Sequence, residues 1–251
     1  MIIYEYPLNE RIRILMRMED LFAKYSHFIA LNAALDHHAA LLALFEILEV
    51  ARGDLKSDLI QELERQRHTL EALRNNPSVK PDALEEVLDN IVATVAQLQA
   101  LSGKLGQHLR DNEWVMSVKQ RACIPGGVCE FDLPSYHYWL SLDPSARRDN
   151  LREWMAPFQA LNNAIVIVLK ILRDSGQPTH RLATQGAYQQ MASGRIAQML
   201  RVALDESLPC FPEISANKYA INIRFTALGT GAERPKVCDT GIEFDLTLCC
   251  L

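Results

Sequence analysis

Hydrophobic positions at helical spacing dominate the first half of the chain. Apolar residues between Leu8 and Ile29 recur at steps of three and four, which is typical of an amphipathic helix. A second helix, rich in leucine and alanine, is predicted over residues 32–52, and Gly53 suits the position that follows a helix end. These two helices are expected to begin a helical body.

The next two predicted helices carry a heptad-like pattern. Positions from Leu59 to Leu73, apolar except for Gln66, and apolar positions from Leu84 to Leu98 alternate steps of four and three, with a break at residues 75–78. Two such helices joined by a short loop predict an antiparallel helical hairpin. Because the pattern spans only about three heptads, we expect its apolar stripe to pack within the chain.

Between the hairpin and the C-terminal half, the pattern predicts a helix, a strand and a long helix. The helix covers residues 101–119, and a turn at 124–127 leads into a strand at 128–133, where apolar and polar residues alternate. Pro144 opens the long helix, which ends near residue 176. Its strongest apolar run is six residues long, far short of the roughly 20 that a membrane span needs, so we expect a buried core helix.

Beyond Pro178 the hydrophobic period changes to two. Residues 200–205, 219–226 and 242–248 alternate apolar with polar side chains, and residues 2–6 are strand-like as well. This alternation predicts an antiparallel sheet with one solvated face.

The elements together predict an α+β protein. A mostly helical domain with the heptad-like hairpin is expected from residues 8–120 and 143–176. An antiparallel β-strand domain is expected from residues 1–7, 124–134 and 180–251, so that neither domain is continuous in sequence.

Composition and charge narrow the classes of function. The chain of 251 residues is 49% hydrophobic and carries a net charge of -5, which argues against sequence-independent binding of nucleic acid. The first residues lack the basic and apolar segments of a secretory signal, so a cytoplasmic protein without membrane insertion is expected.

Motifs for metal or cofactor chemistry are missing from the sequence. The six cysteines form no Cys-x-x-Cys pair, and Cys249 and Cys250 are expected to be free thiols on opposite faces of a terminal strand. His37 and His38 are adjacent and diverge by about 100° on a helix, so polar residues at a helix start are the better interpretation. No glycine cluster fits a nucleotide-binding loop, and we predict no metal, no cofactor and no catalytic residues.

Three cations are candidates for binding a partner. Arg52 ends the second helix, where it also suits the helix dipole, and Arg224 lies on a strand at a position that points away from the core. Lys218 precedes that strand with the same parity as Arg224. If the sheet folds against the helical body, these cations can form a pocket for an acidic, apolar peptide.

Two signatures carry a resemblance to a known family. They are YEYPLNERIR at residues 4–13 and RACIPGGVCEFDLP at residues 121–134, and shorter matches, such as IRF at 223–225, keep the same order along the chain. The sequence resembles the ZapD family of bacterial cell division proteins. The resemblance implies a helical and a β-strand domain, a homodimer without catalytic activity, and binding to the C-terminal tail of FtsZ. It further implies bundling of FtsZ protofilaments and recruitment to the division ring at midcell.

The resemblance also assigns roles to the candidate cations. Arg52 and Arg224 match family positions implicated in the basic pocket that binds the FtsZ tail. A further arginine of the family aligns with Ala220, and Lys218 is the residue expected to compensate. Two alternatives remain open at this point. One is an α+β enzyme with a site in an interdomain cleft, and the other is an adaptor that docks another partner on the hairpin at residues 59–98.

Overall fold

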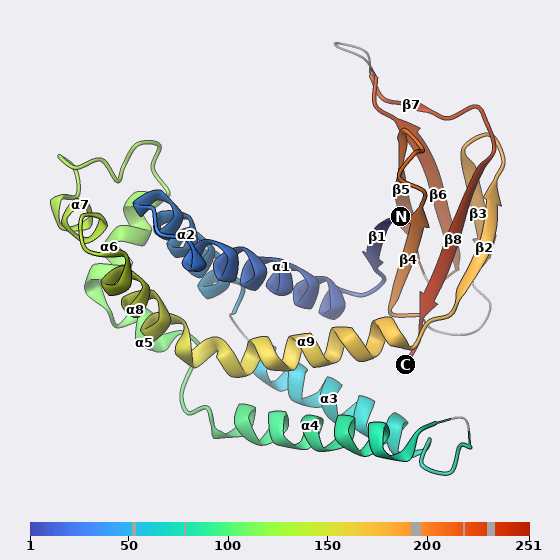
Figure 1. Cartoon of the computed structure of the whole chain (residues 1–251), viewed down its shortest axis with the longest axis horizontal. Coiled ribbons are helices and arrows are strands. Elements are labelled where there is room, and N and C mark those ends of the chain that lie inside the picture. The colour runs from blue at the N-terminus through green and yellow to red at the C-terminus, as the bar shows by residue number, and fades with distance from the viewer. Residues whose placement is uncertain (52–53, 78, 192–196, 218, 230–233) are drawn as a thin grey trace. The chain divides into compact units, whose positions relative to one another are not determined.

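A computed structural model describes the whole chain except residues 52–53, 78, 192–196, 218 and 230–233 (Figure 1). Contacts within the chain divide it into two compact units. A helical unit comprises Ile14–Val168, and a β unit comprises Met1–Arg13 together with Leu169–Leu251. Each unit is described by itself below.

The helices predicted from periodicity in the first half are confirmed. Three of the four present buried apolar residues on one side, as the spacing of three and four requires, whereas the second is buried around most of its circumference. They are α1 (Glu10–Ala30), α2 (Ala34–Val50), α3 (Leu55–Glu71) and α4 (Pro81–Ala100).

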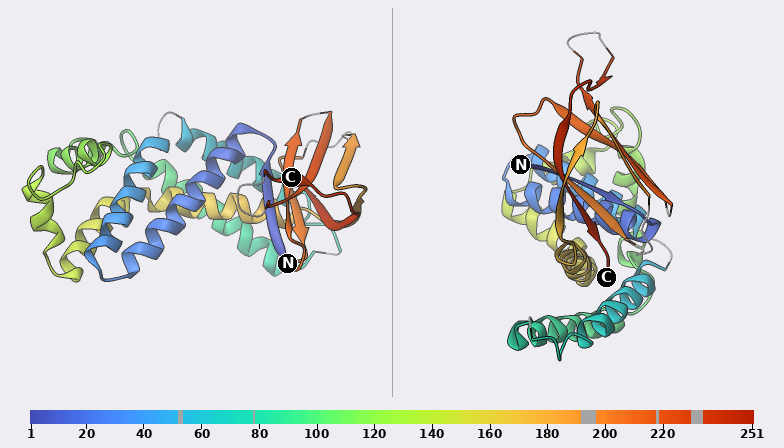
Figure 2. Two further views of the ribbon diagram at one scale, coloured as in Figure 1. Left: turned by 90° about the horizontal axis from the view of Figure 1, so that it is seen from above. Right: turned by 90° about the vertical axis from the view of Figure 1, so that its right-hand side faces the viewer.

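Helices α3 and α4 form the predicted antiparallel hairpin (Figure 1, Figure 2). Most of their heptad positions are buried, including Leu59 and Leu88, whereas Leu70 and Leu73 are half-buried. An Arg74–Glu85 ion pair at 2.8 Å joins the turn that follows α3 to α4 on the exposed side. The side-chain amide of Gln66 donates to the carbonyl of Val168 at 3.1 Å. The apolar stripe of the hairpin is therefore buried within the chain, as expected.

The helix predicted over residues 101–119 is broken into two. Only α5 (Gln107–Arg110) and α6 (Glu113–Ala122) are helical, and they are preceded by turns. Gly106 has φ +70°, and a Cβ there would lie 2.3 Å from a methyl carbon of Leu48. The backbone must turn here in a conformation that glycine tolerates, which the apolar pattern does not reveal.

The predicted strand at 128–133 is wrong. These residues form successive turns, with the N–H of Cys129 bonded to the carbonyl of Gly126 and that of Asp132 to Cys129, and α7 (Pro134–Leu140) follows. Residues 124–134, which were assigned to the β-strand domain, lie within the helical unit. The backbone groups bond locally and none of the described strands pairs with them, so a short alternation of apolar residues did not suffice to form a strand.

The long helix begins as predicted but is interrupted. It consists of α8 (Pro144–Met155), a 3-10 turn η1 (Ala156–Phe158) containing Pro157, and α9 (Gln159–Asp174). Among the described residues, Pro144–Asp174 is the one helical run that is long and apolar enough by composition to cross a membrane. Half of its most apolar stretch is buried. Ile165 and Val168 are fully buried, which is typical of the core helix expected here.

Two antiparallel sheets make up the β unit, where one sheet was predicted. One has the strand order β1-β4-β8-β2, and the other has the order β3-β6-β5 with β7 paired to β6. Four of the five predicted strands are confirmed, as β1, β4, β6 and β8, whereas β2, β3, β5 and β7 were not predicted. The strands are β1 (Ile2–Pro7), β2 (Pro178–Ala183), β3 (Ala187–Met191), β4 (Met199–Leu204), β5 (Cys210–Ala216), β6 (Ala220–Ala227), β7 (Lys236–Val237) and β8 (Ile242–Cys249).

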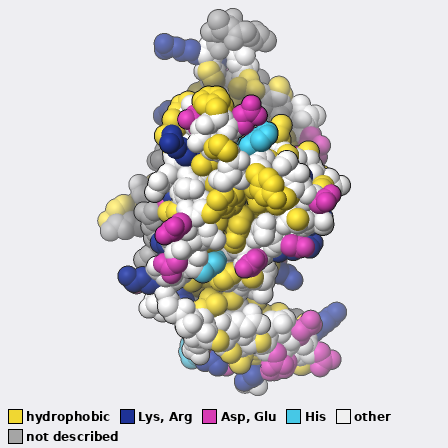
Figure 3. Space-filling view, turned by 90° about the vertical axis from the view of Figure 1, so that its left-hand side faces the viewer, with side chains coloured by type: hydrophobic (Ala, Val, Ile, Leu, Met, Phe, Trp, Pro, Cys, Tyr) yellow, Lys and Arg dark blue, Asp and Glu magenta, His cyan; other side chains and the backbone are white. Residues whose placement is uncertain are grey.

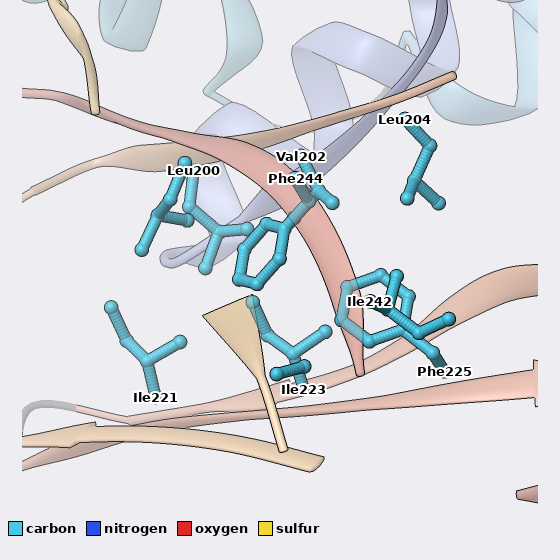
Figure 4. Packing of buried hydrophobic residues seen from close by; sticks show 10 residues of the cluster. Leu200, Val202, Leu204, Ile221, Ile223, Phe225, Ile242 and Phe244 are labelled. Atoms are coloured by element: carbon cyan, nitrogen blue, oxygen red, sulfur yellow. The ribbon is translucent and has the colours of Figure 1, made fainter. Parts of the chain in front are cut away.

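The two sheets share one hydrophobic core. Figure 4 shows Ile223 and Phe225 of β6 directed toward Val202 of β4 and Phe244 of β8. The Phe225 and Phe244 rings lie 5.0 Å apart between centroids. Because successive side chains on a strand point to opposite faces, this core fixes the odd-numbered residues of β6 inward and the even-numbered ones outward.

Candidate peptide-binding surface

Arg224 lies at the centre of the outward face of the β3-β6-β5 sheet. Its neighbours Ile223 and Phe225 are buried in the core, while Arg224 itself is exposed. Strand pairing places Ala187 of β3 and Glu213 of β5 directly beside it. The predicted orientation of Arg224 away from the core is confirmed.

The rest of this outward face is polar in the middle and apolar at one end. Asn222 pairs with Gln189 on one side and Ser215 on the other. Two residues further along β6, Ala220 pairs with Met191, which is 69% exposed. The face therefore presents a cation, a row of amide and hydroxyl groups, and an exposed apolar side chain, which suits an extended peptide with a carboxylate and an apolar residue.

Glu213, directly opposite Arg224, is bonded elsewhere. Its Oε2 accepts a hydrogen bond from the hydroxyl of Thr226 at 3.3 Å. Within the described part of the chain, the guanidinium of Arg224 makes no ion pair or hydrogen bond. An exposed guanidinium without a partner is suited to bind a carboxylate in a bidentate manner.

The other two candidate cations, Arg52 and Lys218, lie outside the described residues. Helix α2 is capped at Ala51, whose N–H donates to Ile47 at 2.8 Å. Ala220, which aligns with a family arginine, lies on the same face of β6 as Arg224, about 13 Å along the strand. Convergence of Arg52 with Arg224 stays a prediction.

The sequence analysis missed an aromatic pocket in the helical unit. All three tryptophans of the chain line it, and the Trp114–Trp154 and Trp139–Trp154 centroids lie 5.6 and 6.0 Å apart. The pocket has a volume of about 410 Å³, and Tyr138 on its wall is 68% exposed. The three tryptophans are far apart in sequence, and their occurrence in one chain was the only signal for this pocket.

The pocket lies on a largely apolar surface. Figure 3 shows hydrophobic side chains gathered at the centre of the end of the helical unit that carries α6, α7 and α8, with acidic side chains around them. The indole N–H groups of Trp114 and Trp139 are bonded to Ser135 and Asn150 at 3.2 and 3.1 Å. With these donors satisfied inside the unit, the pocket offers a partner mainly aromatic surface.

The two adjacent histidines are structural. His37 is fully buried, and its Nε2 contacts the carbonyl of Leu31 at 3.0 Å while its Nδ1 accepts from Nε of Arg147 at 2.9 Å. Burial, together with the charge of Arg147, lowers the pKa of His37, and burial lowers the pKa of His38. Both are therefore neutral at pH 7, and the described residues contain no group of three or more His, Cys, Asp or Glu side chains that could hold a metal ion.

The six cysteines are free thiols, as expected. Cys249 is fully buried at the end of β8, and this burial raises its pKa to about 11, whereas Cys250 is partly exposed. Because the thiolate is the reactive form, Cys249 is a poor nucleophile at neutral pH. It packs as a small hydrophobic residue.

Comparison with known proteins identifies related sequences along the whole chain. Residues 16–224 match the family model ZapD, described as a cell division protein. The cell division protein ZapD of Dechloromonas aromatica is 54% identical over 250 residues, covering 99% of both chains. Those of Azoarcus sp. and Chromobacterium violaceum are 54% and 52% identical over 252 and 250 residues, covering 100% and 99% of both chains.

Proposed function

This chain belongs to the ZapD family of cell division proteins, and we propose that it is a non-enzymatic division factor that binds the C-terminal tail of FtsZ. As a homodimer it would crosslink FtsZ protofilaments into bundles and support the division ring at midcell, acting in the cytoplasm without a cofactor. The observation that carries this proposal is the similarity to ZapD proteins along 99% of the chain.

The outward face of β6 is the surface proposed to bind the tail. It offers the exposed guanidinium of Arg224, which has no side-chain partner among the described residues, polar groups beside it and an exposed Met191. Arg52 and Lys218 are proposed as further cations of the same site. With Ala220 in place of a family arginine, Lys218 would supply a point charge rather than a planar fork, so the binding geometry would differ there.

Bundling follows if each particle holds two tails. A homodimer with one site per subunit can engage two filaments, and each filament presents many tails. The second contact then forms at a high effective concentration, so weak individual contacts combine into strong crosslinking.

The aromatic surface around Tyr138 is proposed as the homodimer interface. Tryptophan and tyrosine are enriched at protein interfaces, and contiguous exposed apolar surface commonly marks them. Tyr138→Glu is expected to yield a monomer in sedimentation velocity. Val92→Glu, at an apolar residue 51% exposed on α4, is the control and should leave the dimer intact. A dimeric Tyr138→Glu variant would contradict this assignment of the interface.

The direct test of function is binding of a synthetic peptide with the sequence of the FtsZ C-terminal tail. Fluorescence anisotropy should show saturable binding to the peptide and none to a scrambled version of the same composition. Affinity should fall as salt is raised from 50 to 300 mM, since exposed charges are screened. Equal binding of the two peptides would overturn the proposed partner.

A further inference from the structure

The pairing of β5 with β6 places two oppositely charged side chains next to each other at the proposed tail site. Glu213 and Arg224 are directly opposite each other on the outward face, at the separation where opposite charges usually attract. Both side chains are exposed, so neither is held in place by the core. Yet no ion pair joins them in the described part of the chain.

Thr226 accounts for the missing ion pair. It lies on β6 two residues beyond Arg224, so its side chain points to the same face, diagonally across from Glu213. Thr226 is only 3% exposed and therefore has a fixed position. Its hydroxyl donates to Oε2 of Glu213 at 3.3 Å, which directs the carboxylate along the strand toward Thr226.

We propose that Thr226 is a positioning residue that keeps Arg224 available to the partner by holding Glu213 away from it. This inference rests on the proposed function, because it assumes that Arg224 binds a carboxylate of an acidic peptide. Glu213 is then an internal competitor for the same guanidinium. The affinity of the surface for the peptide then depends on whether the Glu213 carboxylate accepts from Thr226 or from Arg224.

Substitutions at Thr226 and Glu213 are expected to change the affinity for the peptide in opposite directions. Thr226→Val removes the hydroxyl with little change of shape and frees Glu213 to pair with Arg224, so affinity for the peptide should fall. Glu213→Gln removes the competing charge, so affinity should rise. Since a cross-strand ion pair contributes a few tenths to one kcal/mol and the 3.3 Å hydrogen bond is long, each effect should be about two- to fivefold.

The experiment measures binding of the full chain to the FtsZ tail peptide by anisotropy for Thr226→Val, Thr226→Ser, Glu213→Gln and the Thr226→Val/Glu213→Gln double variant. Thr226→Ser keeps the hydroxyl and should bind like the parent protein. The double variant should recover at least the parent affinity, because without the carboxylate there is nothing for Thr226 to hold. A purely structural role of Thr226 would leave the double variant as weak as Thr226→Val.

Failure of this inference is distinguishable from failure of the proposed function. If Arg224→Ala abolishes binding while Thr226→Val binds like the parent protein, Arg224 binds the peptide and the positioning role is overturned. If Arg224→Ala binds like the parent protein, the surface itself is wrongly assigned and the inference falls with it. Thermal unfolding of each variant identifies any that is not folded, and Glu213→Gln, at an exposed position, gives an independent test.

Discussion

Two arginines, one in each unit, have opposite environments: Arg147 is buried and Arg224 is exposed. Arg147 in the helical unit is 4% exposed and donates to His37 Nδ1, to the carbonyls of Leu140 and Asn32 at 2.8 and 2.9 Å, and to that of Leu142. Arg224 in the β unit is exposed and has no such acceptor among the described residues. Both occur in segments without any recognisable catalytic motif, so sequence context alone does not separate them.

This difference in environment indicates whether each arginine contributes to stability or to association. Arg147 joins the turn between α1 and α2 to the turn between α7 and α8, so its bonds are already made before any partner arrives. Its contribution is to the free energy of unfolding. The guanidinium of Arg224 makes no hydrogen bond or ion pair with any residue that the structure describes, so its contribution is expected to the free energy of association.

The largest effect is expected on removing Arg147. Arg147→Ala leaves three carbonyls and the ring nitrogen of His37 without their donor inside the helical unit. Loss of a buried, multiply bonded charge should lower the free energy of unfolding by about 3 to 5 kcal/mol. Urea unfolding followed by circular dichroism measures this loss.

Arg148→Ala is the matched control for that variant. Arg148 also donates to backbone carbonyls, those of Ile29 and Leu31 at 2.9 and 3.0 Å, but it is only half-buried. Water can replace its bonds, so a loss of about 1 kcal/mol is expected. Equal losses for the two variants would remove the distinction drawn between buried and accessible arginines.

The helices were predictable because their apolar period is local. Helix α1 and the hairpin of α3 and α4 followed from spacing, and α2 followed from its leucine- and alanine-rich composition. Strands β4, β6 and β8 followed from a period of two over buried positions, and β1 from its strand-like residues. By contrast β3 and β5 are mostly exposed or half-buried, and so their sequences carry little alternation. The turns at 128–133 alternate apolar and polar residues as a strand would, and only the absence of a pairing strand among the described residues distinguishes them.

The candidate site, too, could be predicted only where the signal in the sequence is local. The outward orientation of Arg224 was predictable, because Ile223 and Phe225 on either side belong to the core. Its neighbours Glu213 and Thr226 were not, since the register of β5 on β6 is set by tertiary pairing. The aromatic pocket likewise depends on three helices meeting, which no local pattern encodes.

Charge reversal at Arg224 tests whether this exposed arginine contributes to association rather than to stability. Arg224→Glu is expected to weaken association with the FtsZ tail by at least about tenfold, because attraction to a carboxylate becomes repulsion. Cosedimentation with FtsZ bundles should be lost, while the free energy of unfolding stays within about 0.5 kcal/mol of the parent, as for most exposed substitutions. Bundling at parental levels would contradict the assignment of Arg224.

Acidification should act on the helical unit through its histidines. The pKa of His37 is lowered from the ordinary 6.5 by burial and by the charge of Arg147, so the unfolded chain binds a proton more readily than the folded one. Stability should therefore be constant above about pH 7.5 and fall as the pH drops below about 6.5 toward the folded-state pKa. Urea unfolding between pH 7.5 and 5.5 measures the slope. His37→Gln should reduce this slope, and an unchanged slope would assign it to other groups.

The smallest effect is expected from Arg224→Lys, which keeps the charge but removes the planar fork. Lysine can make only point contacts with a carboxylate, so affinity for the tail peptide should fall by about two- to fivefold, with no change in the free energy of unfolding. The same exchange at Arg147, where several acceptors surround one guanidinium, should instead lower stability and leave peptide binding by the folded protein unchanged. If Arg224→Lys bound like the parent protein, Arg224 would act by charge alone, and the bidentate contact inferred from its exposed guanidinium would be wrong.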